Sequence, residues 1–331
     1  MPTPLVSIKM ITYNHAPFIA QAIEGVLRQK TNFPFELIIG EDCSIDGTRE
    51  IVFEYQKKHP DIIRVVTSDK NVGMKKNSLR TMNASQGKYI AFCEGDDYWH
   101  SSDKLQKQAD YLESHPECGL VYSSYDVYHV TSGKKINDFI KYRKKKMLEN
   151  PNISDIVDGK SNPLTCTVMA RRKLCAQITE SDPYLHKSDN FLMGDTQLWA
   201  EMATKVRLHY IPESLATHNI TEESATRSND VTKPIRFSIS NAELMLYLCH
   251  KYDLSQQITH KYEKYFERCS LKLAFHERNT KFADEMRRKN KTFTCEEWLL
   301  YWGAKNSMFY YPIHLAAAIR NLFRKKHDQW R

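Results

Sequence analysis

A regular alternation of short apolar runs and longer amphipathic segments over residues 1–130 constrains the fold of this chain most strongly. Leu5–Thr12, Phe35–Gly40 and Lys88–Cys93 are apolar runs of strand length, whereas Pro17–Gln29 carries apolar residues at helical spacing. Strands and helices that alternate in this way form a parallel sheet with helices on both faces. The near-continuous apolar sequences LIIG and YIAFC suit strands that are covered on both sides. The sequence therefore predicts an α/β fold with a mostly parallel sheet.

The rest of the chain extends this pattern and then departs from it. Up to residue 130 we expect three more helices and two more strands, the helices over 46–59 (with Asp46 as N-cap), 78–85 and 103–114 and the strands over 62–67 and 119–129. The basic, polar stretch 133–162 is expected to be a loop or insertion over the sheet edge. After it we expect a strand at 164–170, a helix at 194–204, a strand at 206–211, and helices at 236–251, 255–277, 281–289 and 295–306. This predicts an α/β domain over residues 1–225 and a helical region over 226–331.

The net charge of +8 favours an anionic partner, such as nucleotide phosphates, nucleic acid or an acidic membrane face. Lys134–Lys146 holds six lysines and one arginine, and Arg320–Arg331 is also basic. A solvated surface is the alternative interpretation of both segments.

The cysteines and the apolar runs bear on the compartment. The eight cysteines form no C-x-x-C pair, which argues against a zinc ribbon and favours reduced thiols. The start, MPTPLVSIKMITYN, lacks the basic and long apolar regions of a signal peptide, and no apolar stretch reaches the roughly 18 residues that a transmembrane helix needs. We therefore expect a cytoplasmic protein.

Acidic residues follow the predicted strands at their carboxyl ends, where open α/β sheets bind ligands. In EGDDYW, Glu94, Asp96 and Asp97 lie within four residues directly after a buried strand. Carboxylates this close repel one another, and Mg²⁺ or Mn²⁺ would relieve that repulsion while bridging to substrate phosphates. A cluster that caps the following helix is the alternative.

Two other strand ends offer contacts to a nucleotide. Glu41 and Asp42 can accept hydrogen bonds from a base or a ribose, and Tyr13 offers a face on which a base can stack. An ordinary turn and helix cap is the alternative for EDCSIDGT, and core packing is the alternative for Tyr13.

Five segments together, in this order, resemble the family 2 inverting glycosyltransferases of the GT-A fold: LVSIKMITYNHAPFIAQAI, ELIIGEDCSIDGT, DKNVGM, QGKYIAFCEGDDYW and GDTQLW. The resemblance covers residues 4–220 and is greatest to bacterial members that build lipopolysaccharide O-antigen and capsule. It implies a Rossmann-like GT-A domain with the nucleotide site in residues 1–130 and the acceptor side in 131–225. It also implies a nucleotide-sugar donor, above all a UDP-sugar, a glycan or lipid-linked glycan acceptor, and Mn²⁺ or Mg²⁺ as cofactor.

The same resemblance implies roles for individual residues. It implies contacts to the nucleotide-sugar from Thr12, Tyr13, Asn14, Glu41, Asp42, Asn71, Gly73, Lys76, Glu94, Asp96 and Asp97. Asp96 and Asp97 are the expected metal ligands, because Glu94-Gly95-Asp96 matches the D-x-D motif. Three of these positions depart from the family pattern: glutamate stands at 41 and 94, and Lys76 replaces a common arginine, with Arg80 one helical turn on.

Asp195 in GDTQLW matches the family's catalytic base, which removes the proton from the attacking acceptor hydroxyl. The glutamate that usually precedes it is Gly194 here. Helix N-capping is the alternative role for Asp195. His218 is a further candidate metal ligand, with a structural histidine as the alternative. The Q-x-x-R-W motif of processive synthases is absent, which favours addition of a single sugar.

The C-terminal stretch 298–331 combines aromatic and basic residues, as amphipathic helices at membrane interfaces do. We expect it to lie on the inner-membrane surface; packing on the catalytic domain or in a homodimer is the alternative.

Other functions fit the sequence less well. A nucleotidyltransferase would need a Gly-rich phosphate loop after the first strand, and a dehydrogenase would need G-x-G-x-x-G there, where TYNHAP stands. The carboxylate cluster would repel nucleic acid. A catalytically inactive nucleotide-sugar-binding module stays open because of Gly194 and Glu94.

Overall fold

The computed structural model describes residues 3–221, 230–290 and 292–312. The chain divides into two compact units. The first comprises Met1–Asn190 and Gly194–Ile220, and the second comprises Phe191–Met193 and Thr221–Arg331. Each unit has its own core.

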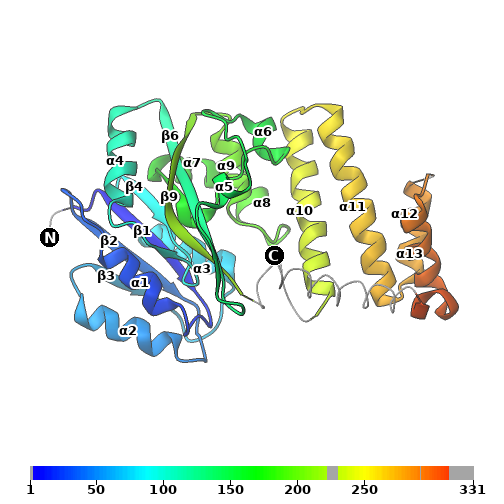
Figure 1. The fold of residues 1–331 in the computed structure, drawn as a ribbon, viewed down its shortest axis with the longest axis horizontal. Coiled ribbons are helices and arrows are strands. Elements are labelled where there is room, and N and C mark those ends of the chain that lie inside the picture. Colours follow the sequence, from blue (N-terminus) through cyan, green and yellow to red (C-terminus); the bar gives the residue numbers. More distant parts are fainter. Residues whose placement is uncertain (1–2, 222–229, 291, 313–331) are drawn as a thin grey trace. The chain divides into compact units, whose positions relative to one another are not determined.

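The first unit is built on a nine-stranded sheet with the order β3-β2-β1-β4-β8-β6-β9-β5, in which β7 pairs with β6 (Figure 1). The strands are β1 Val6–Thr12, β2 Phe35–Glu41, β3 Ile63–Val66, β4 Tyr89–Phe92, β5 Tyr98–Trp99, β6 Cys118–His129, β7 Lys134–Ile136, β8 Met169–Arg171 and β9 Arg207–Ile220. β3, β2, β1 and β4 run parallel, as do β6 and β9. The mostly parallel sheet that the apolar runs predict is therefore present.

Helices connect these strands: α1 Ile19–Leu27, α2 Thr48–Lys58, α3 Met74–Ala84, α4 Lys104–Ser114, α5 Phe139–Tyr142, α6 Ile153–Val157, α7 Arg172–Ser181, α8 Pro183–His186 and α9 Thr196–Met202. Parallel crossovers are right-handed, and the chain moves outward from β1 to β3 before it returns to β4. α1 and α2 therefore lie on one face of the sheet and α3 on the other.

Burial explains why the central strands are so apolar. All four residues of β4 are buried, and Val6, Ile8 and Met10 of β1 are fully buried. These strands are covered on both faces, so most of their residues are apolar, although one face of β1 carries Ser7 and Lys9. Burial at roughly 25 cal/mol per Å² of apolar surface stabilises this part of the sheet and fixes where its polar ends lie.

Several expected boundaries were wrong. α3 begins at Met74, four residues before the predicted 78, because its first turn, MKKN, is polar and hides the helical periodicity. The stretch 133–162 is not a plain loop, since it contains β7, α5 and α6. Residues 165–167 form a short 3₁₀ helix before the antiparallel strand β8. Asp46 is not the N-cap of α2; that position is Gly47, at φ 98°.

β9 is longer than predicted, because the expected turn after residue 211 continues as strand to Ile220. Register shifts between Ser123 and Tyr125 of β6 absorb the irregular IPES sequence as bulges. This extension brings His218 to the carboxyl-end edge of the sheet.

The second unit is helical: α10 Thr232–Lys251, α11 Gln256–Glu277, α12 Thr280–Lys289 and α13 Cys295–Lys305. A capping box formed by Thr294 and Glu297 starts α13. Leu271, Phe275, Met286 and Leu300 form its buried core. Within the described part of the chain, no helix has the length and apolar character needed to cross a bilayer.

We predict that Gly40→Ala destabilises the first unit by about 1–3 kcal/mol, the usual cost of overpacking a core. A Cβ at position 40 would lie 2.0 Å from Thr81 Oγ1 and 2.7 Å from Asn77 Oδ1. Gly194→Ala is the matched control, because its Cβ would meet only the Met74 methyl group, at 4.0 Å. Urea unfolding of the three proteins checks this, and equal midpoints would contradict it.

Candidate functional site

The polar ends of β1, β2 and β4 meet at one edge of the sheet, as the sequence predicts. Thr12 lies opposite Glu41 in the parallel register of β1 and β2. The backbone N–H of Asp42 donates to the Thr12 carbonyl at 3.1 Å, and that of Gly95 donates to the Ile11 carbonyl at 3.0 Å. Three segments far apart in sequence are thereby held side by side.

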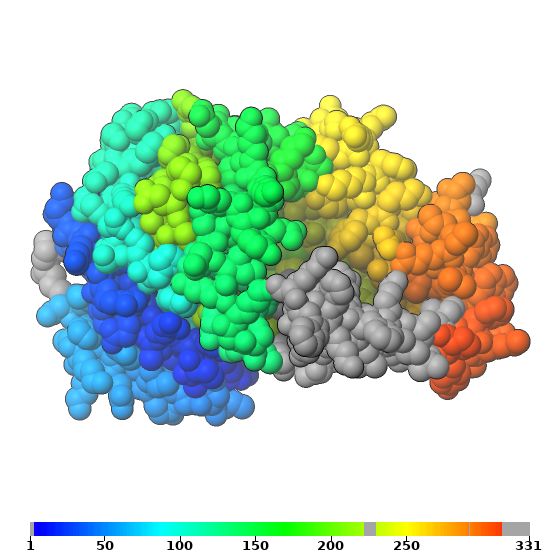
Figure 2. Space-filling view, viewed as in Figure 1, coloured from blue at the N-terminus to red at the C-terminus, as the bar shows by residue number. Residues whose placement is uncertain are grey.

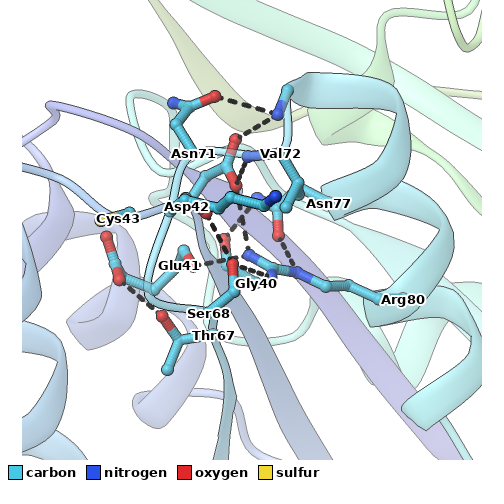
Figure 3. Close-up of polar contacts among 12 residues, drawn as sticks. Gly40, Glu41, Asp42, Cys43, Thr67, Ser68, Asn71, Val72, Asn77 and Arg80 are labelled. Atoms are coloured by element: carbon cyan, nitrogen blue, oxygen red, sulfur yellow. Dashed lines mark hydrogen bonds and ion pairs between the residues drawn. The ribbon is translucent and has the colours of Figure 1, made fainter.

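Asp42 connects the end of β2 to the loop after β3, here called the N-x-G loop after its residues Asn71-Val72-Gly73. Its carboxylate accepts hydrogen bonds from the backbone N–H groups of Val72 and Gly73, both at 2.9 Å (Figure 3). The Asn71 side chain also accepts from the Gly73 N–H, at 2.9 Å. Gly73 has φ 87°, a backbone conformation that favours glycine. Asp42, Asn71 and Gly73 therefore form one connected structure.

Arg80 of α3 stabilises the arrangement of Asp42, Asn71 and Gly73. Its guanidinium donates to the Asn77 side chain at 2.9 Å, to Ser68 Oγ at 2.7 Å and to the Glu41 carbonyl at 2.7 Å, and lies 3.3 Å from Asp42 Oδ1 (Figure 3). The planar fork of arginine suits such multiple contacts. Sequence reasoning did not include Arg80 among the site residues, although its i,i+3 spacing from Asn77 was visible. Lys76, which it did include, is exposed on α3.

Glu41 is fully buried, and its carboxylate is engaged within the protein. It accepts hydrogen bonds from the Ser44 N–H at 2.6 Å and from Thr67 Oγ1 at 2.9 Å. Arg49 Nε lies 3.7 Å away. In this arrangement Glu41 organises the loop after β2, and Asp42 next to it organises the loop after β3.

The segment after β1 presents groups towards the same edge. The Tyr13 side chain is 43% exposed, so its ring is accessible for stacking. Asn14 has φ 54°, and its side chain accepts from the Ile45 N–H at 3.0 Å. Thr12 is buried against Gly95, where a Cβ would lie 2.7 Å from Thr12 Oγ1. Only glycine fits at position 95 without displacing β1.

The carboxylates of the EGDD segment are crowded, and their titration reflects it. Burial raises the pKa of Glu94 well above its usual range, and Asp97, Asp96 and Asp195 raise it further. Burial and then Asp97 raise the pKa of Asp96. His15 Nε2 lies 4.0 Å from Asp96 Oδ2 and opposes that shift. This edge therefore favours an additional positive charge.

The sequence analysis did not predict a role for Lys9 of β1, a cation that interacts electrostatically with Glu94 and Asp195. Its ammonium donates to Ser78 Oγ and lies 5.3 Å from the centroid of the Phe92 ring. Burial lowers the pKa of Lys9, while Glu94, Cys175 and Asp195 counteract that shift. A lysine within an apolar strand gives no periodicity signal for such a role.

Asp97 and His218 contact each other. The sequence analysis predicted each as a metal ligand but did not predict this contact. His218 Nδ1 lies 3.0 and 3.1 Å from the two Asp97 carboxylate oxygens, and the Asn219 N–H donates to Asp97 Oδ1 at 2.9 Å. The Asp97 side chain is 6% exposed, whereas that of Asp96 is 28% exposed. An imidazole that ligates a metal usually bonds a carboxylate through its other nitrogen, which is the role open to Asp97.

The donor set fits a magnesium or manganese ion. Among the described residues, no three His, Cys, Asp or Glu side chains form a group that could hold a metal ion by themselves. Mg²⁺ commonly takes one or two carboxylates and completes its shell with water and substrate phosphates. Within the same part of the chain, the buried oxygens Thr12 Oγ1 and Asn219 Oδ1 have no hydrogen-bond partner. Such atoms suit an edge that a ligand or water completes.

Asp195 stands at the N-terminus of α9. Its Oδ1 accepts from the Thr196 N–H at 2.6 Å, and its Oδ2 accepts from Thr165 Oγ1. It therefore caps the helix, as the alternative interpretation proposed. It also lies close enough to Glu94 to raise that group's pKa. Capping and proximity to the carboxylate cluster thus coexist in one residue.

Comparison with known sequences identifies relatives of this chain. An uncharacterized protein of Mycobacterium tuberculosis is 38% identical over 133 residues, which cover 40% of this chain and 38% of that protein. The putative teichuronic acid biosynthesis glycosyltransferase TuaG of Bacillus subtilis is 34% identical over 137 residues, covering 41% and 52%. The chain thus spans about half the length of these relatives or less. The Escherichia coli UDP-Glc:alpha-D-GlcNAc-diphosphoundecaprenol beta-1,3-glucosyltransferase WfgD is 28% identical over 191 residues, covering 57% and 68%.

Solved structures share the fold. Staphylococcus aureus TarS 1–349 in complex with UDP-GlcNAc aligns over 90% of this chain and 79% of its own, with a TM-score of 0.56 and 19% identity. The mannosyltransferase PcManGT of Pyrobaculum calidifontis, in complex with GDP-Man and Mn²⁺, aligns over 98% and 88%, with a TM-score of 0.56 and 16% identity. These alignments confirm the predicted GT-A-like architecture with a helical C-terminal region.

The sequence profile described as Glycosyl transferase family 2 matches residues 7–172. This range begins in β1 and includes both the N-x-G loop and the EGDD segment. With about half of the chain matched, and with the motifs assembled at one sheet edge, the chain belongs to glycosyl transferase family 2.

Proposed function

We propose that this protein transfers a sugar from a nucleotide-diphosphate sugar to a glycan or lipid-linked glycan, with inversion at the anomeric carbon, in bacterial surface polysaccharide synthesis. The observation that carries the proposal is the gathering of Glu94, Asp96, Asp97 and Asp195 into one electrostatic cluster at the carboxyl-end edge of the sheet. A cluster of this kind suits a divalent cation on a donor diphosphate. Family membership supports it.

The proposed division of labour follows from the contacts described. Tyr13 stacks on the nucleobase, and the loops that Glu41 and Asp42 organise surround the base and the ribose. Asp96 and His218 would hold Mn²⁺ or Mg²⁺, with Asp97 orienting the His218 imidazole. When bound, the ion would neutralise the charge on the departing nucleotide. Asp195 accepts the proton of the acceptor hydroxyl as it attacks the anomeric carbon from the side opposite the nucleotide.

UDP is the proposed nucleotide. WfgD carries UDP-Glc in its name, and TarS 1–349 is a complex with UDP-GlcNAc. PcManGT is instead a complex with GDP-Man, so a guanine nucleotide is the comparison to make.

A nucleotide-sugar-binding module without transferase activity is the second candidate. One observation favours it: both carboxylate oxygens of Asp195 already accept hydrogen bonds, from Thr196 and Thr165. These bonds give Asp195 a structural role as the cap of α9 that does not require catalysis.

We predict that UDP binds wild type in the presence of Mn²⁺ and that Asp96→Ala weakens binding at least about tenfold, a loss near 1.4 kcal/mol. Calorimetric titration of UDP, GDP and dTDP, with Mn²⁺ and with EDTA, measures this. Asp110→Ala is the control, since Asp110 is an exposed α4 carboxylate that bonds only Gln106 in the contacts described. Failure of folded wild type to bind any nucleotide would refute the proposed function.

We predict that Asp195→Asn lowers the rate of Mn²⁺-dependent UDP release from the donor by roughly 10²–10⁴-fold, the usual contribution of a general base. The Kd for UDP should not change, because the variant removes a base and not a nucleotide contact. Asp103→Asn, at the N-cap position of α4, provides the matched control. An unchanged rate would favour the binding module.

We also propose that residues 298–331 bind the cytoplasmic face of the inner membrane. Trp302 is 46% exposed, and Met308 and Phe309 are exposed nearby. Residues 313–331, which include the basic end of the segment, lie outside the described residues. Aromatic side chains beside basic residues suit an anionic interface, where each basic residue contributes about 1 kcal/mol.

We predict that a chain ending at residue 307 binds vesicles containing phosphatidylglycerol at least about tenfold less tightly than the full chain. Co-sedimentation measures this, with vesicles of phosphatidylcholine alone as the control. Equal binding by both chains would contradict the membrane role, and a change of oligomeric state with unchanged vesicle binding would favour the dimer alternative.

A further inference from the structure

The basic segment 134–146 has no role in the transfer chemistry described above. It carries six lysines, one arginine and one aspartate over 13 positions. Because like charges at this density repel one another, a segment of this kind favours an anionic partner. The position of the segment in the sheet indicates which anionic partner it binds.

Strand register places the start of this segment beside the carboxylate cluster. Ile136 of β7 pairs with Val127 of β6, and Val127 pairs with His218 of β9. Neighbouring strands are about 4.8 Å apart, so Ile136 is roughly 10 Å from His218. His218 in turn contacts Asp97. The segment therefore begins two strands away from the proposed metal site, on the side opposite β5.

The segment is held firmly on the sheet. The Asp138 N–H donates to Asp126 Oδ1 at 2.9 Å, and Ser124 Oγ donates to the Asp138 carboxylate. Asp138 also caps α5. The Phe139 ring packs against Tyr125, with centroids 5.6 Å apart. The segment is thus held on the sheet, and the part of the chain to which it belongs, drawn in green, lies on the face shown in Figure 2.

The cations of the segment differ in what they contact. Lys135 forms an ion pair with Asp126 at 2.9 Å, and Lys145 donates to the Gly159 carbonyl at 3.3 Å. The other five are exposed, and among the described residues no carboxylate lies within ion-pair distance of them: Lys134, Lys141, Arg143, Lys144 and Lys146. Two cations anchor the segment and five face solvent.

We propose that this surface binds phosphate groups of the acceptor, so that the acceptor is itself a phosphate-bearing glycan. The proposal rests on the proposed function. An anionic acceptor that approaches Glu94, Asp96 and Asp97 meets repulsion, and the exposed cations of this segment, which begins two strands away, would offset it. The donor diphosphate does not need them, because the proposed metal site serves that diphosphate. A sugar on a lipid diphosphate and a phosphodiester-linked glycan share this chemistry.

The experiment compares binding of three soluble probes to protein saturated with UDP and Mn²⁺, which occupy the donor site. The probes are N-acetylglucosamine linked through diphosphate to a short prenyl chain, a glycerol-phosphate oligomer, and the octyl glycoside of N-acetylglucosamine, which lacks phosphate. The variant combines Lys141→Gln, Arg143→Gln and Lys144→Gln. The control, with the same charge change on other exposed cations, combines Lys57→Gln, Lys58→Gln and Lys205→Gln.

We expect at least one phosphate probe to bind wild type and the control equally, and to bind the variant at least about tenfold less tightly, with an effect that salt reduces. The tighter phosphate probe identifies the source of the phosphate. Equal affinity of the variant and the control for both phosphate probes would overturn the inference, as would absence of binding to wild type. In the co-sedimentation assay described above, a variant that loses only its binding to phosphatidylglycerol vesicles, with unchanged affinity for both phosphate probes, would also overturn the inference. That result would assign the surface to the membrane. UDP titration separates the two failures, because a wild type that binds UDP keeps the proposed function even where this inference fails.

Discussion

Mutual repulsion among carboxylates at one sheet edge is the interaction on which the site depends. Glu94 and Asp96 follow directly from β4, and Asp195 approaches them from α9, so the fold concentrates negative charge where it also excludes water. The protein offsets part of this with Lys9 inside the sheet and with imidazoles at its margin. The remaining excess of negative charge is what a divalent cation would resolve. Carboxylate repulsion thus destabilises the site when it is empty and favours binding of a cation.

Much of this could be predicted from the sequence, because the central strands are largely apolar and their ends are marked by compact polar motifs. The strands at 35–41 and 89–92 agree with the apolar runs within one or two residues. Parallel strands carry their carboxyl ends to one edge, so the meeting of Thr12, Glu41 and Gly95 needed no further information. Each of these inferences used only local pattern and the topology that the pattern implies.

The rest depended on tertiary contacts that leave no local trace. Arg80 looks like any helical arginine until Ser68 and the Glu41 carbonyl are placed beside it. Glu41 resembles a ligand in sequence, yet it is fully buried and bonds Ser44 and Thr67. The predicted β9 was too short because IPES looks like a turn, and only pairing with β6, across bulges in β9 itself, holds that sequence extended. For Arg80, Glu41 and β9, tertiary contacts determined the outcome, and local secondary-structure propensity did not.

The bonds between Asp97 and the end of β9 have a consequence for biogenesis. Asp97 and His218 are 121 positions apart, and His218 belongs to one of the last strands of the sheet. A ribosome adding 5–20 residues per second needs roughly 6–24 s to cover that distance. During that interval the nascent chain carries a finished β4 and an acidic segment whose imidazole and amide partners have not been synthesised. The candidate site is therefore completed only after most of the sheet that carries it has been synthesised.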